Sequence, residues 1–110
     1  MTQMKELHVP VPRDRLEAFC RKWGVAELSL FGSVLREDFG PDSDVDVLIE
    51  FAPDSGRNLW EWPDMEDELS ALFGRRVDLV SKRGLRNPFF RRRILDAREV
   101  VFAAQSHGDR

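Results

Sequence analysis

This sequence has few cysteines and histidines and no long apolar run. Cys20 is the only cysteine, which excludes a disulfide framework and a cysteine-based zinc site. The two histidines, His8 and His107, lie near opposite ends and lack metal-ligand spacing. No apolar run approaches the ~20 residues of a membrane span, and the opening residues lack the apolar segment of a signal peptide. We therefore expect a cytoplasmic protein with no membrane association.

An excess of basic residues is also missing. The formal net charge of −3 argues against a general nucleic-acid binder, because such proteins carry positive charge that neutralises phosphates. The charges are unevenly spread: 12 of the 20 acidic residues lie between Glu37 and Glu68, whereas nine of the 17 Lys and Arg residues lie between Arg75 and Arg98. Such blocks usually form solvated helix faces, so position within a motif has to identify any functional charge.

The apolar pattern predicts helices alternating with strands. Helices are expected at 12–24, 33–38, 59–74 and 87–96, and strands at 25–33, 44–51, 75–82 and 99–104. This order predicts an α/β fold in which helices pack against a mixed β-sheet. The length of 110 residues allows one domain with a modest core, from about 11 to 104, followed by a flexible tail at 105–110.

The first predicted helix has a clear apolar face. Leu16, Phe19, Cys20 and Trp23 recur at helical spacing, and Gly24 suits the position just after the helix. Cys20 is expected to be a small buried hydrophobe rather than a reactive thiol, because no activating His or basic cluster is evident beside it.

Two aspartates of the strand at 44–51 are the first candidate functional residues. Asp44 and Asp46 lie two residues apart, so both carboxylates face the same side, about 7 Å apart along the backbone. Like charges that close repel, and a hard cation with oxygen ligands, Mg²⁺ above all, relieves the repulsion. A bare Asp-X-Asp pair is more often solvent-facing on an edge strand, so other residues have to support this interpretation.

That support comes from Gly32 and Ser33, which precede Asp44 by a ten-residue spacer. Glycine lets the backbone approach a ligand, and the Ser33 hydroxyl and the N–H groups opening the next helix can hold phosphate oxygens. Arg36 follows Ser33 by one helical turn and is a further phosphate candidate. Gly-Ser before a helix is usually only a turn and a cap, but its combination with the aspartates is much rarer.

Asp78 completes the candidate set. It is a lone acid in an apolar strand, where burial is costly without a partner. If its strand lies beside the strand at 44–51, three carboxylates converge and could hold the two ions of two-metal phosphoryl transfer. The alternative is a solvent-exposed side chain, or one paired with Arg75 or Arg76.

The combined motif resembles the minimal nucleotidyltransferase (MNT) family of the DNA polymerase beta superfamily. The resemblance extends over about residues 11–104 and implies a polymerase beta-like nucleotidyltransferase fold. The residues that carry it are Gly32, Ser33, Asp44, Asp46 and Asp78, flanked by Phe31, Arg36 and Ser43.

The resemblance also implies roles for these residues. Asp44 and Asp46 would bind both Mg²⁺ ions, and Asp78 would complete the catalytic metal site or orient the attacking hydroxyl. All three would be catalytic residues. Gly32 and Ser33 would hold the triphosphate, and Arg36 and Ser43 complete the predicted substrate-binding residues.

The activity implied is Mg²⁺-dependent transfer of AMP from ATP to a hydroxyl. Members of this family are often antitoxins paired with a HEPN ribonuclease toxin, whose tyrosine they adenylylate, so an assembly with such a partner is the leading hypothesis. One alternative is a binding module that neutralises the partner by contact alone. Another is transfer to a small molecule such as an aminoglycoside, which normally needs added residues to form an acceptor pocket.

Two further groups of residues are expected to be structural. Trp60 and Trp62 could cover a nucleotide base, but an aromatic pair at a helix start more often packs in a core or an interface. Arg91, Arg92 and Arg93 are expected to form a solvated helix face, although one of them could contact phosphate or an acidic partner.

Overall fold

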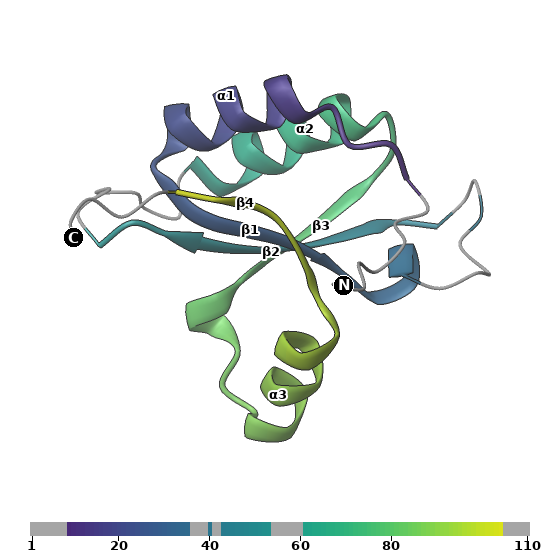
Figure 1. Cartoon of the computed structure of the whole chain (residues 1–110), viewed down its shortest axis with the longest axis vertical. Helices are drawn as coiled ribbons and strands as arrows, with labels where there is room; N and C mark the ends of the chain where they lie inside the picture. Colours follow the sequence, from purple (N-terminus) through teal and green to yellow (C-terminus); the bar gives the residue numbers. More distant parts are fainter. Residues whose placement is uncertain (1–8, 36–39, 41–42, 54–60, 105–110) are drawn as a thin grey trace, which may run out of the picture.

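Helices alternate with strands along the chain, and the strands form one sheet (Figure 1). The computed structural model describes residues 9–35, 40, 43–53 and 61–104. The elements are α1 (Arg13–Trp23), β1 (Val25–Phe31), the 3-10 helix η1 (Gly32–Leu35), β2 (Val45–Phe51), α2 (Trp62–Phe73), β3 (Val77–Ser81), the 3-10 helix η3 (Lys82–Gly84), α3 (Pro88–Ala97) and β4 (Glu99–Ala103).

The sheet is mixed, as predicted. Its strand order is β3-β2-β1-β4, with β2 and β3 parallel and the other two pairs antiparallel. A parallel pair needs a crossover connection, and α2 supplies it between β2 and β3. The predicted order of elements is confirmed, except that the short helix expected from residue 33 is a 3-10 helix in its described part.

Helices α1 and α2 cover one face of the sheet and enclose the main core (Figure 1). The predicted apolar face of α1 is confirmed, since all four of its expected core residues are buried. Both helices end as expected at a glycine in the left-handed conformation, Gly24 with φ 71° and Gly74 with φ 72°. The side chains of β2 that point into this core are Val45, Val47 and Ile49.

Helix α3 lies on the opposite side of the sheet (Figure 1). Leu48 of β2 packs there in a smaller cluster with Leu85 and Ile94. Because side chains alternate along a strand, Asp46 shares the face of Leu48. The sheet face that carries the aspartate is therefore the face beside α3.

Two expectations about aromatic and basic residues can be compared with the structure. Trp62 packs against Phe51, with ring centroids 6.5 Å apart, which confirms packing, whereas Trp60 lies outside the described residues. Arg92 and Arg93 are exposed as expected. The expectation is wrong for Arg91, which is half-buried because its guanidinium donates hydrogen bonds to two backbone carbonyls, those of Lys82 (3.3 Å) and Leu85 (3.4 Å).

None of the helices in the described part of the chain is long and apolar enough to cross a membrane.

Candidate active site

The parallel pairing of β2 with β3 places Asp46 directly beside Asp78. These two residues are partners in the strand register, and Phe31 of β1 pairs with Asp46 from the other side. Neighbouring strands lie only about 5 Å apart, so the two carboxylates project from adjacent backbones on one face of the sheet. The strand of Asp78 therefore lies beside the strand of Asp46, as the three-aspartate hypothesis requires.

The backbone of Gly32 lies very close to the Asp46 carboxylate. Its φ of +75° lies in the left-handed region that disfavours a side chain. A Cβ atom at this position would overlap Asp46 Oδ2 and would lie 3.2 Å from Asp46 Cγ. Backbone conformation and space therefore both require glycine here, and the peptide at the end of β1 reaches contact distance of the carboxylate.

A cavity of about 890 Å³ opens over Asp46 and Asp78. One wall comes from the end of β1, from η1 and from the two aspartate strands, and the other wall comes from α3. The lining residues on α3 include Phe90, Arg93 and Asp96. Phe90 and Asp96 were not predicted at the site, and Arg93 was only one of three arginines that could contact phosphate, because the helical pattern of α3 does not reveal where the helix docks.

Asp44 occupies a different position from the other two aspartates. It is exposed and lies one residue before β2 begins, although a strand was expected from residue 44. Asp44 is not among the described residues that line the cavity. Its backbone leads directly into Asp46, so the loop before β2 sets the position of both side chains.

That loop is held by hydrogen bonds from two sides. Ser43 N–H donates to the Gly40 carbonyl (3.0 Å), and Gly40 N–H donates to the Ser43 hydroxyl (3.1 Å). From the end of α2, Arg75 Nη1 donates to the carbonyls of Gly40 (2.8 Å) and Ser43 (3.1 Å). Arg75 was predicted only as an alternative partner of Asp78, whereas in the structure it donates hydrogen bonds to the segment that precedes Asp44.

We predict that Arg75 positions the aspartates. Arg75→Met keeps the aliphatic stem but removes the donors, and it should lower kcat/KM for nucleotidyl transfer by about ten- to a hundredfold, since small displacements of reacting groups have effects of this size. Arg76→Met is the matched control, because Arg76 is exposed and its backbone carbonyl, which accepts from Val45 N–H, stays in place. Equal activities of the two variants would contradict the positioning role.

The remaining predicted substrate-binding groups are only partly described. Gly32 and the backbone of Ser33 belong to η1. The side chain of Ser33 and the whole of Arg36 lie outside the described residues. Roles for these two side chains therefore stay predictions.

The carboxylates can be compared with the needs of Mg²⁺. Within residues 9–35, 40, 43–53 and 61–104, no group of three or more His, Cys, Asp or Glu side chains is already arranged to hold a metal ion. Mg²⁺ prefers hard oxygen ligands and is commonly held by one or two carboxylates, with water and substrate phosphates completing its shell. The pair Asp46 and Asp78 on one cavity fits that mode of binding.

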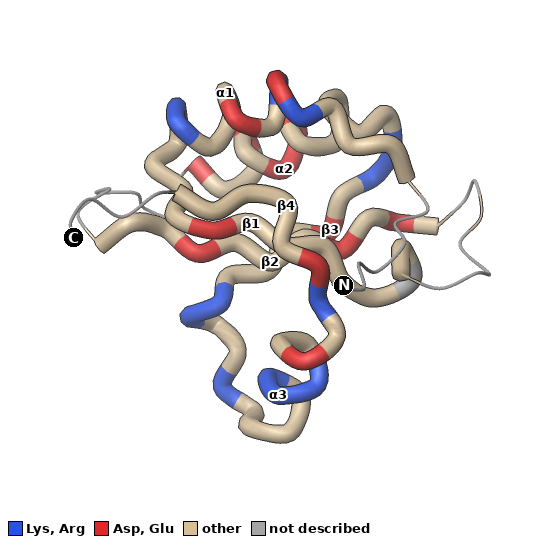
Figure 2. The backbone as a smooth tube through the Cα atoms, viewed as in Figure 1, with Lys and Arg blue, Asp and Glu red and all other residues tan. Residues whose placement is uncertain are grey.

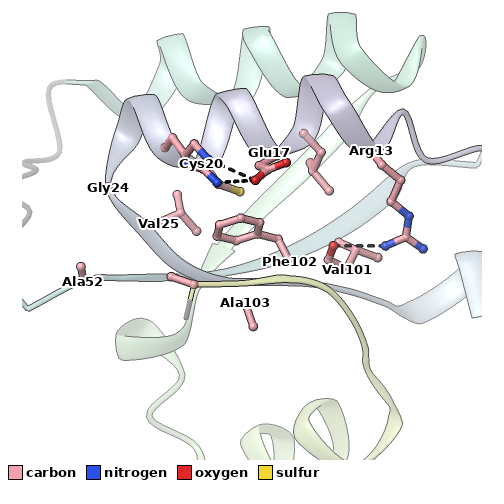
Figure 3. A pocket seen from close by; sticks show the side chains of 12 residues that line it. Arg13, Glu17, Cys20, Gly24, Val25, Ala52, Val101, Phe102 and Ala103 are labelled. Atoms are coloured by element: carbon pink, nitrogen blue, oxygen red, sulfur yellow. Dashed lines mark hydrogen bonds and ion pairs between the residues drawn. The ribbon is translucent and has the colours of Figure 1, made fainter. Parts of the chain in front are cut away.

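A second cavity, of about 760 Å³, lies between α1 and β4 (Figure 3). Arg13 lies at one end of it and donates to the Val101 carbonyl (3.3 Å), and Cys20 lines its inner side. Burial, followed by the charge of Glu17, raises the pKa of the Cys20 thiol to about 12. Cys20 is fully buried, which confirms the small buried hydrophobe predicted here, and its thiol is not activated as a nucleophile.

Comparisons with known proteins identify the family. The family model for a nucleotidyltransferase domain matches residues 13–101. The protein adenylyltransferase MntA of Thermococcus cleftensis is 38% identical over 81 residues, which are 74% of this chain and 77% of that relative. A solved structure described as a candidate minimal nucleotidyltransferase is 36% identical and superposes with a TM-score of 0.65, covering 78% of this chain and 85% of the other.

A more distant solved structure shares the fold. It is described as a tri-AMPylated Shewanella oneidensis HEPN toxin in complex with an MNT antitoxin, and the match is 20% identical with a TM-score of 0.59. It covers 84% of this chain and 71% of the other. Together with the paired aspartates beside Gly32, the family match over residues 13–101 shows that this chain belongs to the nucleotidyltransferase domain family.

Proposed function

We propose that this chain is a protein adenylyltransferase that moves AMP from ATP to a tyrosine hydroxyl of a HEPN-type partner protein, in a Mg²⁺-dependent reaction. The observation that carries the proposal is the pairing of Asp46 with Asp78 at a cavity closed on one side by Gly32. Adjacent carboxylates near the start of two paired strands suit phosphoryl chemistry, in which catalysis consists mainly of positioning and charge neutralisation.

The reaction forms one bond and breaks one. The acceptor oxygen attacks the α-phosphorus of ATP, the bond from that phosphorus to the bridging oxygen of the β-phosphate breaks, and pyrophosphate leaves. Asp78, exposed at the cavity, orients the acceptor hydroxyl and takes its proton. Gly32 lets the backbone approach the phosphates beside Asp46.

In this proposal Asp46 and Asp78 hold the metal at the cavity, and Asp44, which lies just before β2, is the third predicted ligand. Bound Mg²⁺ supplies neutralisation of the negative charge that develops on the phosphate oxygens. The predicted triphosphate contacts of Gly32 and Ser33, and the further substrate contacts of Arg36 and Ser43, complete the proposed site. Ser43 has a structural part as well, because its hydroxyl accepts the Gly40 N–H.

Two findings support a protein as the acceptor. The relative from Thermococcus cleftensis is a protein adenylyltransferase and is 38% identical to this chain. The distant structure from Shewanella oneidensis contains a HEPN toxin that carries AMP groups beside an MNT antitoxin. The second of these makes a HEPN-type protein the first acceptor to test, and the family resemblance implies a tyrosine as its acceptor residue.

The test is direct transfer to a purified partner. Incubation of this chain with a HEPN-type protein from the same genome, ATP and Mg²⁺ should add AMP groups, each visible by mass spectrometry as a mass increase on a partner tyrosine. Chelation of the metal by EDTA should abolish the transfer. If no mass increase appears while the partner's ribonuclease activity is still neutralised, neutralisation by contact alone replaces the enzymatic proposal.

A further inference from the structure

The start of α3 presents two aromatic side chains to solvent. Phe89 is 82% exposed and Phe90 is 53% exposed, and the third exposed large hydrophobic residue in the described part of the chain, Val100, is 39% exposed. The helix start is fixed, because Asn87 Oδ1 accepts hydrogen bonds from the N–H groups of Phe89 (3.0 Å) and Phe90 (3.1 Å). The two phenylalanines are thus exposed on a helix whose first turn is held by its N-cap residue.

Basic residues flank these rings in the sequence. Arg86, Arg92 and Arg93 are all exposed, and Figure 2 shows Lys and Arg concentrated on α3 and on the segment that leads into it. No acidic residue lies in the first turn of α3. Aromatic residues and arginines are both enriched in protein interfaces and among the interface residues that contribute most to binding.

The residues of α3 divide between two surfaces. Phe90 and Arg93 line the cavity over Asp46 and Asp78. Phe89 and Arg92 are exposed but are not among the described residues that line it. The outward residues of α3 therefore lie on the same helix as one wall of the cavity, within reach of a macromolecule that places a hydroxyl there.

We propose that Arg86, Phe89 and Arg92, here named the α3 surface, dock the acceptor protein through an acidic patch with an apolar centre. The identity of the acceptor rests on the function proposed above. The basic side chains attract and orient the acidic patch, and Phe89 anchors it by burying its ring. Docking at this surface holds the acceptor hydroxyl at the cavity wall formed by Phe90 and Arg93.

Two variants test this surface without changing the cavity. Phe89→Ser removes the anchor, and Arg86→Glu with Arg92→Glu reverses the charge. Titration calorimetry with the purified HEPN-type protein, without nucleotide, should show Kd raised about tenfold or more in each variant, the size typical of interface centres. Added salt should weaken binding of the wild type more than binding of the charge-reversal variant.

Transfer kinetics give an independent readout. Both variants should raise KM for the acceptor and leave KM for ATP and kcat at saturating acceptor unchanged, because no cavity residue is replaced. Arg15→Glu is the control: this exposed residue lies on α1, on the opposite side of the sheet, and its charge reversal should leave Kd unchanged. Thermal unfolding followed by circular dichroism verifies that each variant is folded.

The outcomes separate this proposal from the proposed function. If Kd rises as expected but the wild type transfers no AMP, the docking surface stands and adenylyl transfer falls. If transfer occurs but Kd is the same in wild type and both variants, or rises equally in Arg15→Glu, the docking surface is overturned. It is also overturned if the wild type does not bind the partner, or if ultracentrifugation shows that Phe89→Ser abolishes self-association only.

Discussion

Asp46→Asn is expected to lower kcat/KM for AMP transfer by about a thousandfold, or ~4 kcal/mol of transition-state stabilisation. The substitution keeps the size of the side chain but removes the negative charge beside Gly32 and Asp78. It should also abolish the rise in melting temperature that ATP with Mg²⁺ gives the wild type, since a ligand stabilises a protein only by binding its native state.

Glu50→Gln is the matched control for this prediction. Glu50 lies on the same strand and the same face as Asp46, but it forms an ion pair with Lys82 (3.2 Å) and is not among the described residues that line the cavity. Transfer assays and thermal shifts should find this variant close to wild type. Comparable losses in the two variants would show that any loss of negative charge on β2 disables the protein, and that Asp46 has no special role.

Gly32→Ala is expected to reduce both stability and activity. The left-handed φ costs a side chain ~1 to 2 kcal/mol. The added Cβ would also displace the Asp46 carboxylate with which it overlaps, so that transfer should fall by about a hundredfold. Denaturant unfolding and the transfer assay measure the two effects separately.

A substitution at Gly74 distinguishes the effect of backbone strain from the effect of displacing the Asp46 carboxylate. Gly74 has φ +72°, nearly the same as Gly32, but a Cβ there would meet nothing within 4 Å. Gly74→Ala should therefore lose a similar ~1 to 2 kcal/mol of stability from its backbone strain alone and keep its transfer rate. If Gly74→Ala lost activity as severely as Gly32→Ala, reduced stability would explain both results and the contact with Asp46 would be irrelevant.

Local features of this fold could be predicted from the sequence. Helical spacing identified the buried face of α1, and Gly24 marked its end, because both depend on residues a few positions apart. Alternation along β2 and β3 likewise predicted that their aspartates lie opposite the apolar face. The pattern could not show that these strands are neighbours, since periodicity describes the faces of a strand and not its place in a sheet.

The second wall of the cavity could not be predicted for a related reason. Phe90 and Arg93 reach the site only because Ile94 packs on Leu48 and brings α3 against the sheet. Ile94 and Leu48 are 46 positions apart in the sequence, so a local sequence pattern could not predict their contact. Arg91 escaped prediction in the same way, because its carbonyl partners belong to the chain that enters α3 from η3.

The position of β4 has a consequence for how the protein folds. This strand pairs with β1, joining Ala103 to Glu27, so one edge of β1 stays open until nearly the whole described chain has been synthesised. An unpaired edge is a template for association between chains, and pairings between distant segments form slowly. That edge of β1 therefore stays open to association with other chains until Glu99–Ala103 pairs with it, and loss of this short segment would uncover a largely buried strand.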